Sequence, residues 1–334
     1  MSIEKRNIPN PNETRTLTRR KFLATLAGMG AGLVAGSVTG VEYPNLKKLI
    51  RETVSDKNEL RGETESLIEK IKEKYGFEVS FTVPNDYVNQ INNGHTMYVT
   101  GEPLNAIEKR DGIMLLFLAV SVYPPEYIKN IGLEKIVLVN DLRIAKFSNL
   151  PKDSQKSVAG FTDAQNNFYI SFSAGTIGGW LNDFMVNEGI HHELYHLANY
   201  KEDGNVYIDR DWFNLNPDGE NDYDIYRSSD GKLHRGEIPG EIVADKIKRR
   251  ARHVGFSETY GMTDIAEDKA TIAEALITHN TEIMEKCSKD KILAEKVKRI
   301  KADYYKWTQG KFNNAFWNDL ENGKIKADYW DTKR

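Results

Sequence analysis

The stretch Ile190-His191-His192-Glu193-Leu194-Tyr195-His196-Leu197 is the most informative part of this chain. Residues four apart lie on the same face of a helix, so the imidazoles of His192 and His196 could bind one zinc ion. Glu193, directly after the first of them, could then act as general base toward an attacking water. The pattern His-Glu-x-x-His therefore predicts a zinc helix.

The residues around this pattern favour a helix with one buried side, to which Leu194 and Leu197 would contribute. His191 projects about 100° away from His192 on a helix, so it cannot share the ligand face. We expect His191 to pack or to support a ligand. The alternative is a solvated helix that carries paired histidines without a metal.

A catalytic zinc site needs a third protein ligand, and two glutamates downstream are candidates. Glu241 is followed four residues later by Asp245, which would put two carboxylates on one helix face. That spacing also suits a solvated face beside basic residues. Glu267 lies in a stretch predicted to run from a loop into a helix, with Thr263 or Asp264 as the N-cap. Spacing alone leaves both candidates open.

His192-Glu193-x-x-His196, followed by Tyr260-Gly261-x-Thr263 and then Glu267, resembles zinc metallopeptidases of the anthrax lethal factor catalytic-domain type. It is also similar to secreted, gluzincin-like bacterial zinc peptidases with a His-His-Glu-x-x-His helix. The resemblance implies that Glu267 is the third ligand of one zinc ion and that Tyr260 stabilises the oxyanion. It further implies a zincin-like fold and an endopeptidase that acts on a protein or peptide.

The resemblance has limits along the chain. It covers roughly residues 60–280 by pattern, but its specific motifs occupy only 190–200 and 256–275. Family members often carry a second glutamate four residues after the ligand, and this chain has Thr271 there. The separation between His196 and Glu267 is longer than in lethal factor, which implies an insertion at 201–237. Within that insertion Asp218-Gly219-Glu220-Asn221-Asp222 resembles a calcium loop only weakly.

The first 41 residues differ from the rest of the chain. Arg19-Arg20-Lys21-Phe22-Leu23 precedes a Gly/Ala-rich apolar run from Ala24 to Val38. Paired arginines directly before such a run are typical of a twin-arginine export signal. We therefore expect export by the twin-arginine machinery to a secreted, periplasmic or surface-anchored location. The alternatives are a lone membrane anchor or an amphipathic helix, and only this segment is expected to meet a membrane.

Composition is that of a globular protein. Of 334 residues, 40% are hydrophobic and 28% are charged, which is ordinary for a globular protein. The net charge of −3 implies no general affinity for nucleic acid. Cys287 is the single cysteine, so an intramolecular disulfide and a multi-cysteine zinc site are both excluded.

Hydrophobic spacing predicts an α+β fold, with a small mixed sheet, then the zinc helix, then a mainly helical C-terminal half. After a linker at 42–57, one peptidase domain is expected over 58–334, with an α/β half at 58–200 and a helical half at 201–334. The predicted helices are 60–75, 105–122, 291–307 and the zinc helix, and the predicted strands are 77–81, 136–139, 158–161 and 168–172. The last strand is a candidate edge for an extended substrate, or else a fully paired interior strand.

The resulting hypothesis is an exported zinc endopeptidase with Glu193 as base and Tyr260 as oxyanion donor. One alternative is an amidase that cleaves cell-wall peptides at the same zinc site. Another is a non-catalytic zinc-binding surface protein, which would have no need of Glu193 and Tyr260.

Overall fold

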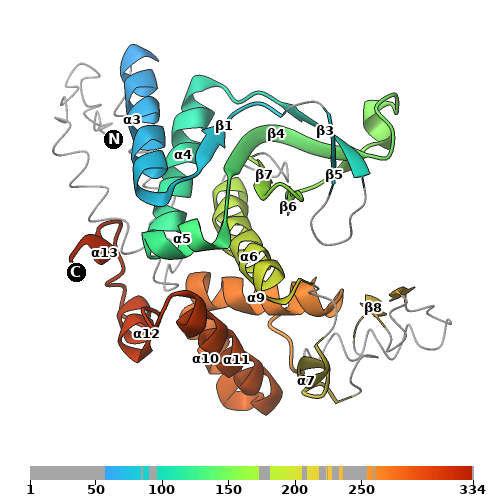
Figure 1. Ribbon diagram of the computed structural model, residues 1–334, viewed down its shortest axis with the longest axis vertical. Helices are drawn as coiled ribbons and strands as arrows, with labels where there is room; N and C mark the ends of the chain where they lie inside the picture. Colours follow the sequence, from blue (N-terminus) through green and yellow to red (C-terminus); the bar gives the residue numbers. More distant parts are fainter. Residues whose placement is uncertain are drawn as a thin grey trace, which may run out of the picture.

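The computed structural model describes residues 57–83, 86–89, 96–172, 181–204, 209–217, 223, 225–227, 233–235, 254–258 and 260–332. The expected export signal at 1–41, most of the linker and Glu241 lie outside these residues. The main sheet lies in the N-terminal half, together with several helices, and the C-terminal half is mainly helical (Figure 1). The predicted α+β class is thus confirmed.

The first helix and strand lie close to their predicted places. Helix α3 (Lys57–Tyr75) is followed by Gly76 at a φ of 86°. Glycine adopts this left-handed conformation without a side-chain clash, so it ends the helix as expected. Strand β1 (Glu78–Ser80) comes next and pairs in parallel with the long central strand β4 (Lys135–Ala145).

Seven strands form one mixed sheet, whose main path runs β2-β3-β4-β7-β6. The remaining strands of that path are β2 (Tyr87–Asn89), β3 (Thr96–Glu102), β6 (Gly160–Thr162) and β7 (Asn167–Ser171), and β5 (Lys156–Ser157) pairs with β4. Strands β2 and β3 were not predicted, because their sequences are largely polar. Their pairing is marked only by the buried Val88, Met97 and Val99.

The strand predicted over 168–172 is an interior strand, so its candidate role as substrate-binding edge is wrong. Strand β7 pairs in parallel with β4 and antiparallel with β6. Its run Phe168-Tyr169-Ile170 is buried on both faces, as is usual for a central strand. The edge of this side of the described sheet is β6, which forms the predicted hairpin with β7.

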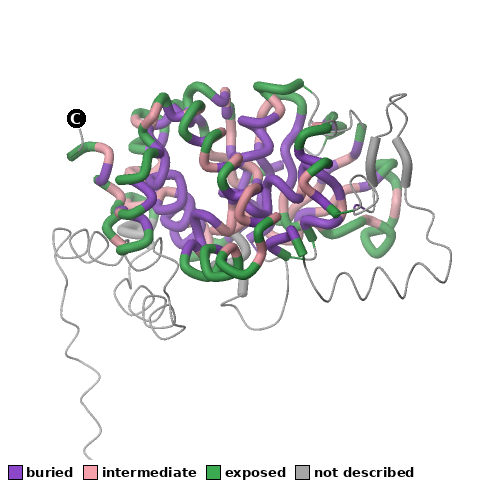
Figure 2. Tube along the Cα trace, turned by 90° about the horizontal axis from the view of Figure 1, so that it is seen from below, coloured by how far each residue is buried: buried purple, intermediate pink, exposed green. Residues whose placement is uncertain are grey.

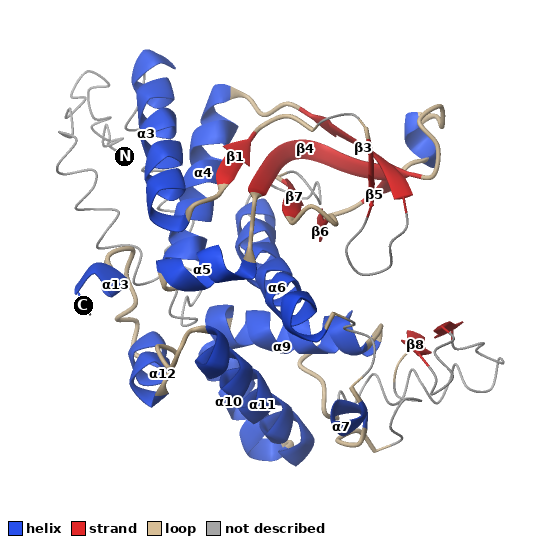
Figure 3. Ribbon diagram, viewed as in Figure 1, coloured by secondary structure: helices blue, strands red, loops and turns tan. Residues whose placement is uncertain are grey.

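Helices cover this sheet. Helix α4 (Ala106–Ser121) begins at a capping box, in which Asn105 and Glu108 each accept a backbone N–H of the other. After the expected stop near Pro124, the chain forms a short helix, α5 (Pro125–Ile131), that was not predicted. The helix with the motif, α6 (Leu181–Asp203), runs between the sheet and the C-terminal helices (Figure 3).

The C-terminal half is mainly helical, as predicted. Its elements are α7 (Arg210–Phe213), the hairpin of β8 (Ile225–Arg227) and β9 (Leu233–Arg235), the 3-10 turn η3 (Tyr260–Met262), α9 (Ile265–Thr278), α10 (Asn280–Lys289), α11 (Lys291–Trp307), α12 (Asn314–Glu321) and α13 (Tyr329–Thr332). Helix α9 packs across α6, and this crossing brings the two halves together (Figure 1).

Aromatic side chains from the last helices complete the core. The rings of Phe312 and Phe316 stack 3.8 Å apart, and Phe312 stacks on Tyr123 at 5.8 Å. The indole of Trp330 donates a hydrogen bond to the carbonyl of Val122 at 2.8 Å. The buried chain forms a continuous layer through the body of the molecule, with exposed segments around it (Figure 2). In the part of the chain that is described, we find no helix long and apolar enough to cross a bilayer.

Candidate metal centre

Helix α6 presents two different faces at the motif. Ile190, Leu194 and Leu197 are almost wholly buried and fix the helix in the core. His192 and His196 are also buried, and they turn toward α9. The apolar spacing that predicted the helix thus also determines which way its imidazoles point.

Helix α9 supplies the third group. Its N-cap is Asp264, whose carboxylate accepts the backbone N–H of Glu267 at 3.0 Å. Asp264 is one of the two caps that the sequence suggested, and the helix begins at Ile265 as a result. Glu267 therefore lies in the first turn of α9, where the crossing with α6 brings it to the histidines.

One imidazole nitrogen of each histidine and one carboxylate oxygen of Glu267 lie close together where α9 crosses α6. Oε2 of Glu267 lies 2.8 Å from Nε2 of His192 and 3.4 Å from Nε2 of His196. The two Nε2 atoms are 3.1 Å apart. Tetrahedral zinc with bonds of about 2.0–2.1 Å separates its ligand atoms by about 3.3 Å, so this donor set has the right size for one zinc ion.

The charges of these neighbouring groups also shift the pKa values of Glu267 and His192. Burial opposes ionisation of Glu267, but the adjacent His196 and His192 hold the pKa of its carboxyl below the ordinary value. Burial likewise opposes protonation of His192, while Glu267 and Glu274 raise its pKa. A bound cation would satisfy all three electron-rich groups at once, so the chemistry of the donor set also fits a metal.

Glu193 lies beside this set. One of its ligand-type atoms falls within 4.8 Å of those of His192 and His196. The hydroxyl of Thr162, at the end of β6, donates a hydrogen bond of 2.9 Å to Oε2 of Glu193. Oε2 of Glu267 approaches the imidazoles more closely, at 2.8 and 3.4 Å.

Tyr260 lies near the histidines, in the turn η3. Its ring centroid is 5.9 Å from that of His192. Burial, with the charges of Glu267 and Glu193, raises the pKa of Tyr260, although 53% of the residue is exposed. The hydroxyl therefore keeps its proton at neutral pH and can donate it in a hydrogen bond.

Glu274 is a residue of the site that the sequence did not single out. Its Oε2 lies 3.1 Å from Nδ1 of His192, opposite the nitrogen that faces Glu267. A carboxylate there fixes the tautomer and orientation of a ligand imidazole. The signal was present, because Glu274 follows Glu267 by two helical turns and so shares its face. The family pattern predicts the supporting glutamate four residues after Glu267, and the chain has it seven residues after instead.

The position four residues after Glu267 has another use. The hydroxyl of Thr271 donates to the carbonyl of Asp268 and accepts from Ser257, both at 3.1 Å. A Cβ added at Gly261 would lie 2.8 Å from the same hydroxyl oxygen. Thr271 therefore packs beneath the turn that carries Tyr260.

His191 lies on the opposite face of α6 from the ligand atoms, in the aromatic core. Its Nδ1 is 2.9 Å from the hydroxyl of Tyr123, and burial lowers the pKa of His191 to about 3. The other candidate third ligand, Glu241, lies outside the described residues. Of the candidate site residues, the structure thus gathers His192, Glu193, His196, Tyr260 and Glu267 at one place.

Comparison with known proteins gives little further information. No protein-family model matches the chain, and no curated protein matches it. One solved structure that resembles it is described as a "putative zinc-binding metallo-peptidase" from Bacteroides caccae, with 13% identity and a TM-score of 0.48. The match covers 83% of this chain and 97% of that one.

Proposed function

We propose that this protein is a zinc-dependent endopeptidase of the zincin type. The observation that carries the proposal is the approach of Glu267 to both His192 and His196, with Glu193 and Tyr260 beside them. His192, His196 and Glu267 would hold one zinc ion. When bound, zinc lowers the pKa of a water molecule and polarises a carbonyl group.

The residues around the ligands would divide the remaining work. Glu193 would take the proton of the attacking water and later deliver it to the leaving amine. Thr162 would hold the Glu193 carboxylate in place through its hydrogen bond of 2.9 Å. Tyr260 would donate a hydrogen bond to the carbonyl oxygen as negative charge develops there.

The sheet edge favours polypeptide as the substrate. Strand β6 lies at the edge of the described sheet and ends at Thr162, whose side chain contacts Glu193. An extended peptide could add to such an edge by main-chain hydrogen bonds, which would place its backbone next to the base. A short cross-linked cell-wall peptide would make fewer of these bonds. This observation favours an endopeptidase over an amidase.

The test compares wild type with Glu193→Gln on a pool of unstructured peptides, with cleavage followed by mass spectrometry and bound zinc measured in parallel. We expect the variant to lose cleavage by about 10²-fold or more and to keep its zinc, because the base is not a ligand. Glu295→Gln, which alters a glutamate on α11, is the matched control. Full cleavage by Glu193→Gln would contradict the proposal.

A second measurement examines the ligand set. Glu267→Ala should bind zinc at least about tenfold more weakly than wild type, because a site with two histidines alone is incomplete. Equal zinc affinity in the two proteins would remove Glu267 from the ligands.

Export belongs to the same proposal and rests on Arg19-Arg20 and the apolar run after them. Residues 1–41 fused to a folded reporter should carry it out of the cytoplasm. Arg19→Lys together with Arg20→Lys should stop this export, and unchanged export would contradict the twin-arginine route.

A further inference from the structure

Asp268, the residue after Glu267 in α9, is wholly buried on a different face of the helix from the ligand. Three groups from separate parts of the chain donate to its Oδ2. They are Nε1 of Trp212 at 2.8 Å, the hydroxyl of Tyr223 at 2.6 Å and Nζ of Lys296 at 2.7 Å. A single carboxylate oxygen thereby connects α7, Tyr223 and α11 to the first half of α9.

The ion pair within this group is also buried. The side chains of Asp268 and Lys296 both have 0% exposure, and Nζ of Lys296 lies 4.0 Å from the ring centroid of Phe256. A buried ion pair gives little net stability compared with apolar residues of the same size, because both charges must leave water. Its advantage is a specific geometry, since charged hydrogen-bonding groups tolerate few arrangements.

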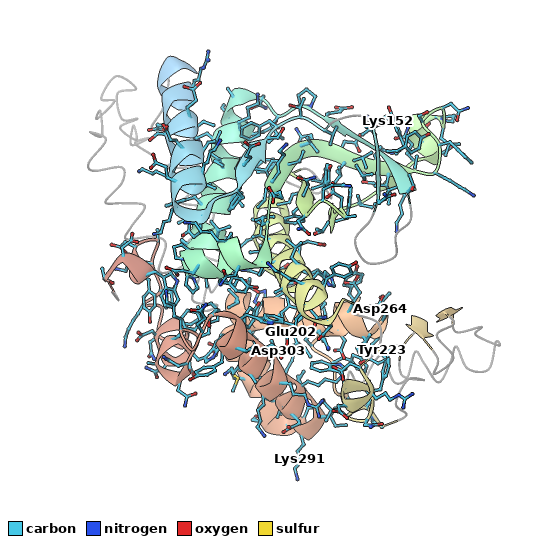
Figure 4. All side chains as sticks on the ribbon, in the orientation of Figure 1. Lys152, Glu202, Tyr223, Asp264, Lys291 and Asp303 are labelled. Carbon is cyan, nitrogen blue, oxygen red and sulfur yellow. The ribbon has the colours of Figure 1, made fainter. Side chains whose placement is uncertain are left out.

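A second contact reinforces the same side of α9. Nζ of Lys269 lies 2.8 Å from the carboxylate of Asp209, which is also the N-cap of α7. Tyr223 and Asp264 are both labelled in Figure 4 and lie toward the N-terminal end of α9. Asp209, Trp212 and Tyr223 therefore all contact the beginning of α9, next to Glu267.

The turn with Tyr260 rests on the same point. A Cβ added at Gly261 would lie 3.2 Å from Cα of Asp268, so the backbones of η3 and α9 are in close contact there. A rotation of α9 about its axis would displace Glu267 and Tyr260 together. The contacts of Asp268 oppose such a rotation.

We propose that Asp268 is a positioning residue that sets the rotation of α9, and thereby places Glu267 against His192 and His196. The inference rests on the proposed function, because it takes Glu267 as a zinc ligand. This proposal gives a role to Trp212 of α7 and to Tyr223, which do not touch the metal site and would affect it through Asp268. By reciprocity, zinc binding would strengthen the docking of these two residues on α9.

Two of the variants tested each remove one donor to Asp268 and leave the ion pair intact, and a third, Asp268→Asn, also removes the negative charge of that pair. Tyr223→Phe and Trp212→Phe each delete one hydrogen bond to Asp268 and keep a ring in the core. Zinc affinity is measured by competition with a chelating dye, and thermal stability is measured on the metal-free proteins. We expect each variant to bind zinc about 3- to 10-fold more weakly, and Asp268→Asn to bind it at least about tenfold more weakly.

Two control variants separate positioning from general stability. Tyr329→Phe removes a tyrosine hydroxyl that donates to Asp319 at 3.0 Å, far along the chain from α9. Leu320→Ala opens a cavity beside α12 and should lower the melting temperature by at least as much as the variants at Trp212, Tyr223 and Asp268. Both controls should keep the zinc affinity of wild type.

Hydrogen exchange gives an independent readout. Zinc should increase the protection of amides at 209–217 in wild type, and this increase should be smaller in Tyr223→Phe. Wild-type zinc affinity in Tyr223→Phe, Trp212→Phe and Asp268→Asn alike would overturn the proposal, and a loss of affinity in Leu320→Ala equal to theirs would do the same. If wild type bound no zinc, or Glu267→Ala bound it normally, the proposed metal site itself would fail, and the role of Asp268 with it.

Discussion

A carboxylate oxygen of Glu274 lies 3.1 Å from Nδ1 of His192, while Glu267 approaches the other nitrogen of the same ring. The imidazole of His192 is thus held between two glutamates of α9, two helical turns apart. Nδ1 of His196, by contrast, is buried without a hydrogen-bond partner among the described residues. Of the two proposed histidine ligands, His192 therefore has a carboxylate that orients its ring from behind, and His196 has none in the described part of the chain.

Replacing Glu274 should weaken the metal site. We expect Glu274→Ala to lower zinc affinity by about 10- to 100-fold, because the ligand ring loses the carboxylate that orients it. Glu274→Gln should lose less, since its amide oxygen can still accept from Nδ1. Chelator competition measures both constants. An unchanged zinc affinity in Glu274→Ala would show that the contact has no role in metal binding.

Thr162 should affect turnover without affecting zinc. In Thr162→Val the carboxylate of Glu193 loses its donor at 2.9 Å while the volume of the side chain is kept. We expect kcat to fall by about tenfold, because the base is less well placed. Thr162→Ser, which keeps the hydroxyl, should recover most of the activity. Equal kcat values for wild type and Thr162→Val would contradict this role.

Gly261 should be sensitive to a single methyl group. In Gly261→Ala the new Cβ would lie 2.8 Å from the Thr271 hydroxyl, so the turn with Tyr260 must shift. We expect kcat to fall by about 10- to 100-fold with zinc affinity nearly unchanged. Adding Thr271→Ala should restore part of the activity, because it removes the nearest atom. No recovery would show that the contact with the Asp268 backbone dominates.

Asp303 should make stability depend on pH. Burial raises the pKa of Asp303 to about 6, although Tyr195 donates a hydrogen bond of 2.8 Å to its carboxylate. A raised folded-state pKa means that the protonated form is favoured on folding. The protonated Asp303 carboxyl therefore contributes fully to the free energy of unfolding below its unfolded-state pKa of about 4. This contribution is lost as the pH rises through the folded-state pKa of about 6.

Asp303→Asn removes this dependence and keeps an acceptor for Tyr195. The free energy of unfolding of the variant, relative to wild type, should increase by roughly 2 kcal/mol between pH 4 and pH 7. Urea denaturation of metal-free protein at several pH values measures the difference. The exposed Asp153→Asn is the control and should show no such trend. A constant difference between Asp303→Asn and wild type would contradict the assignment.

Local features of the sequence predicted much of the fold. The stop of α3 at Gly76, the cap at Asp264 and the helix of the motif depend on neighbours in the chain, and all three are found. Contacts between distant segments were harder to predict. The interior position of β7 is decided by pairing with β4 and β6, which apolar alternation does not determine.

The candidate site shows the same division. His192 and His196 could be read from one helix, because their spacing is a local property. The approach of Glu274 to His192 and of Thr162 to Glu193 requires the packing of α9 and β6 on α6, so neither residue was identified from the sequence. The hydrogen bonds that Asp268 accepts from Trp212, Tyr223 and Lys296 join residues far apart in the chain, so they could not be predicted from local spacing either.

The aromatic residues that pack against α6 bear on how this protein assembles during synthesis. Tyr195 of α6 packs against Tyr304 and Trp307 of α11, with ring centroids 5.7 and 5.1 Å away, and Tyr123 stacks on Phe312. The residues of α11 are synthesised after those of α6. Helix α6 can therefore complete its packing only once α11 has left the ribosome, and we expect metal loading to follow that step.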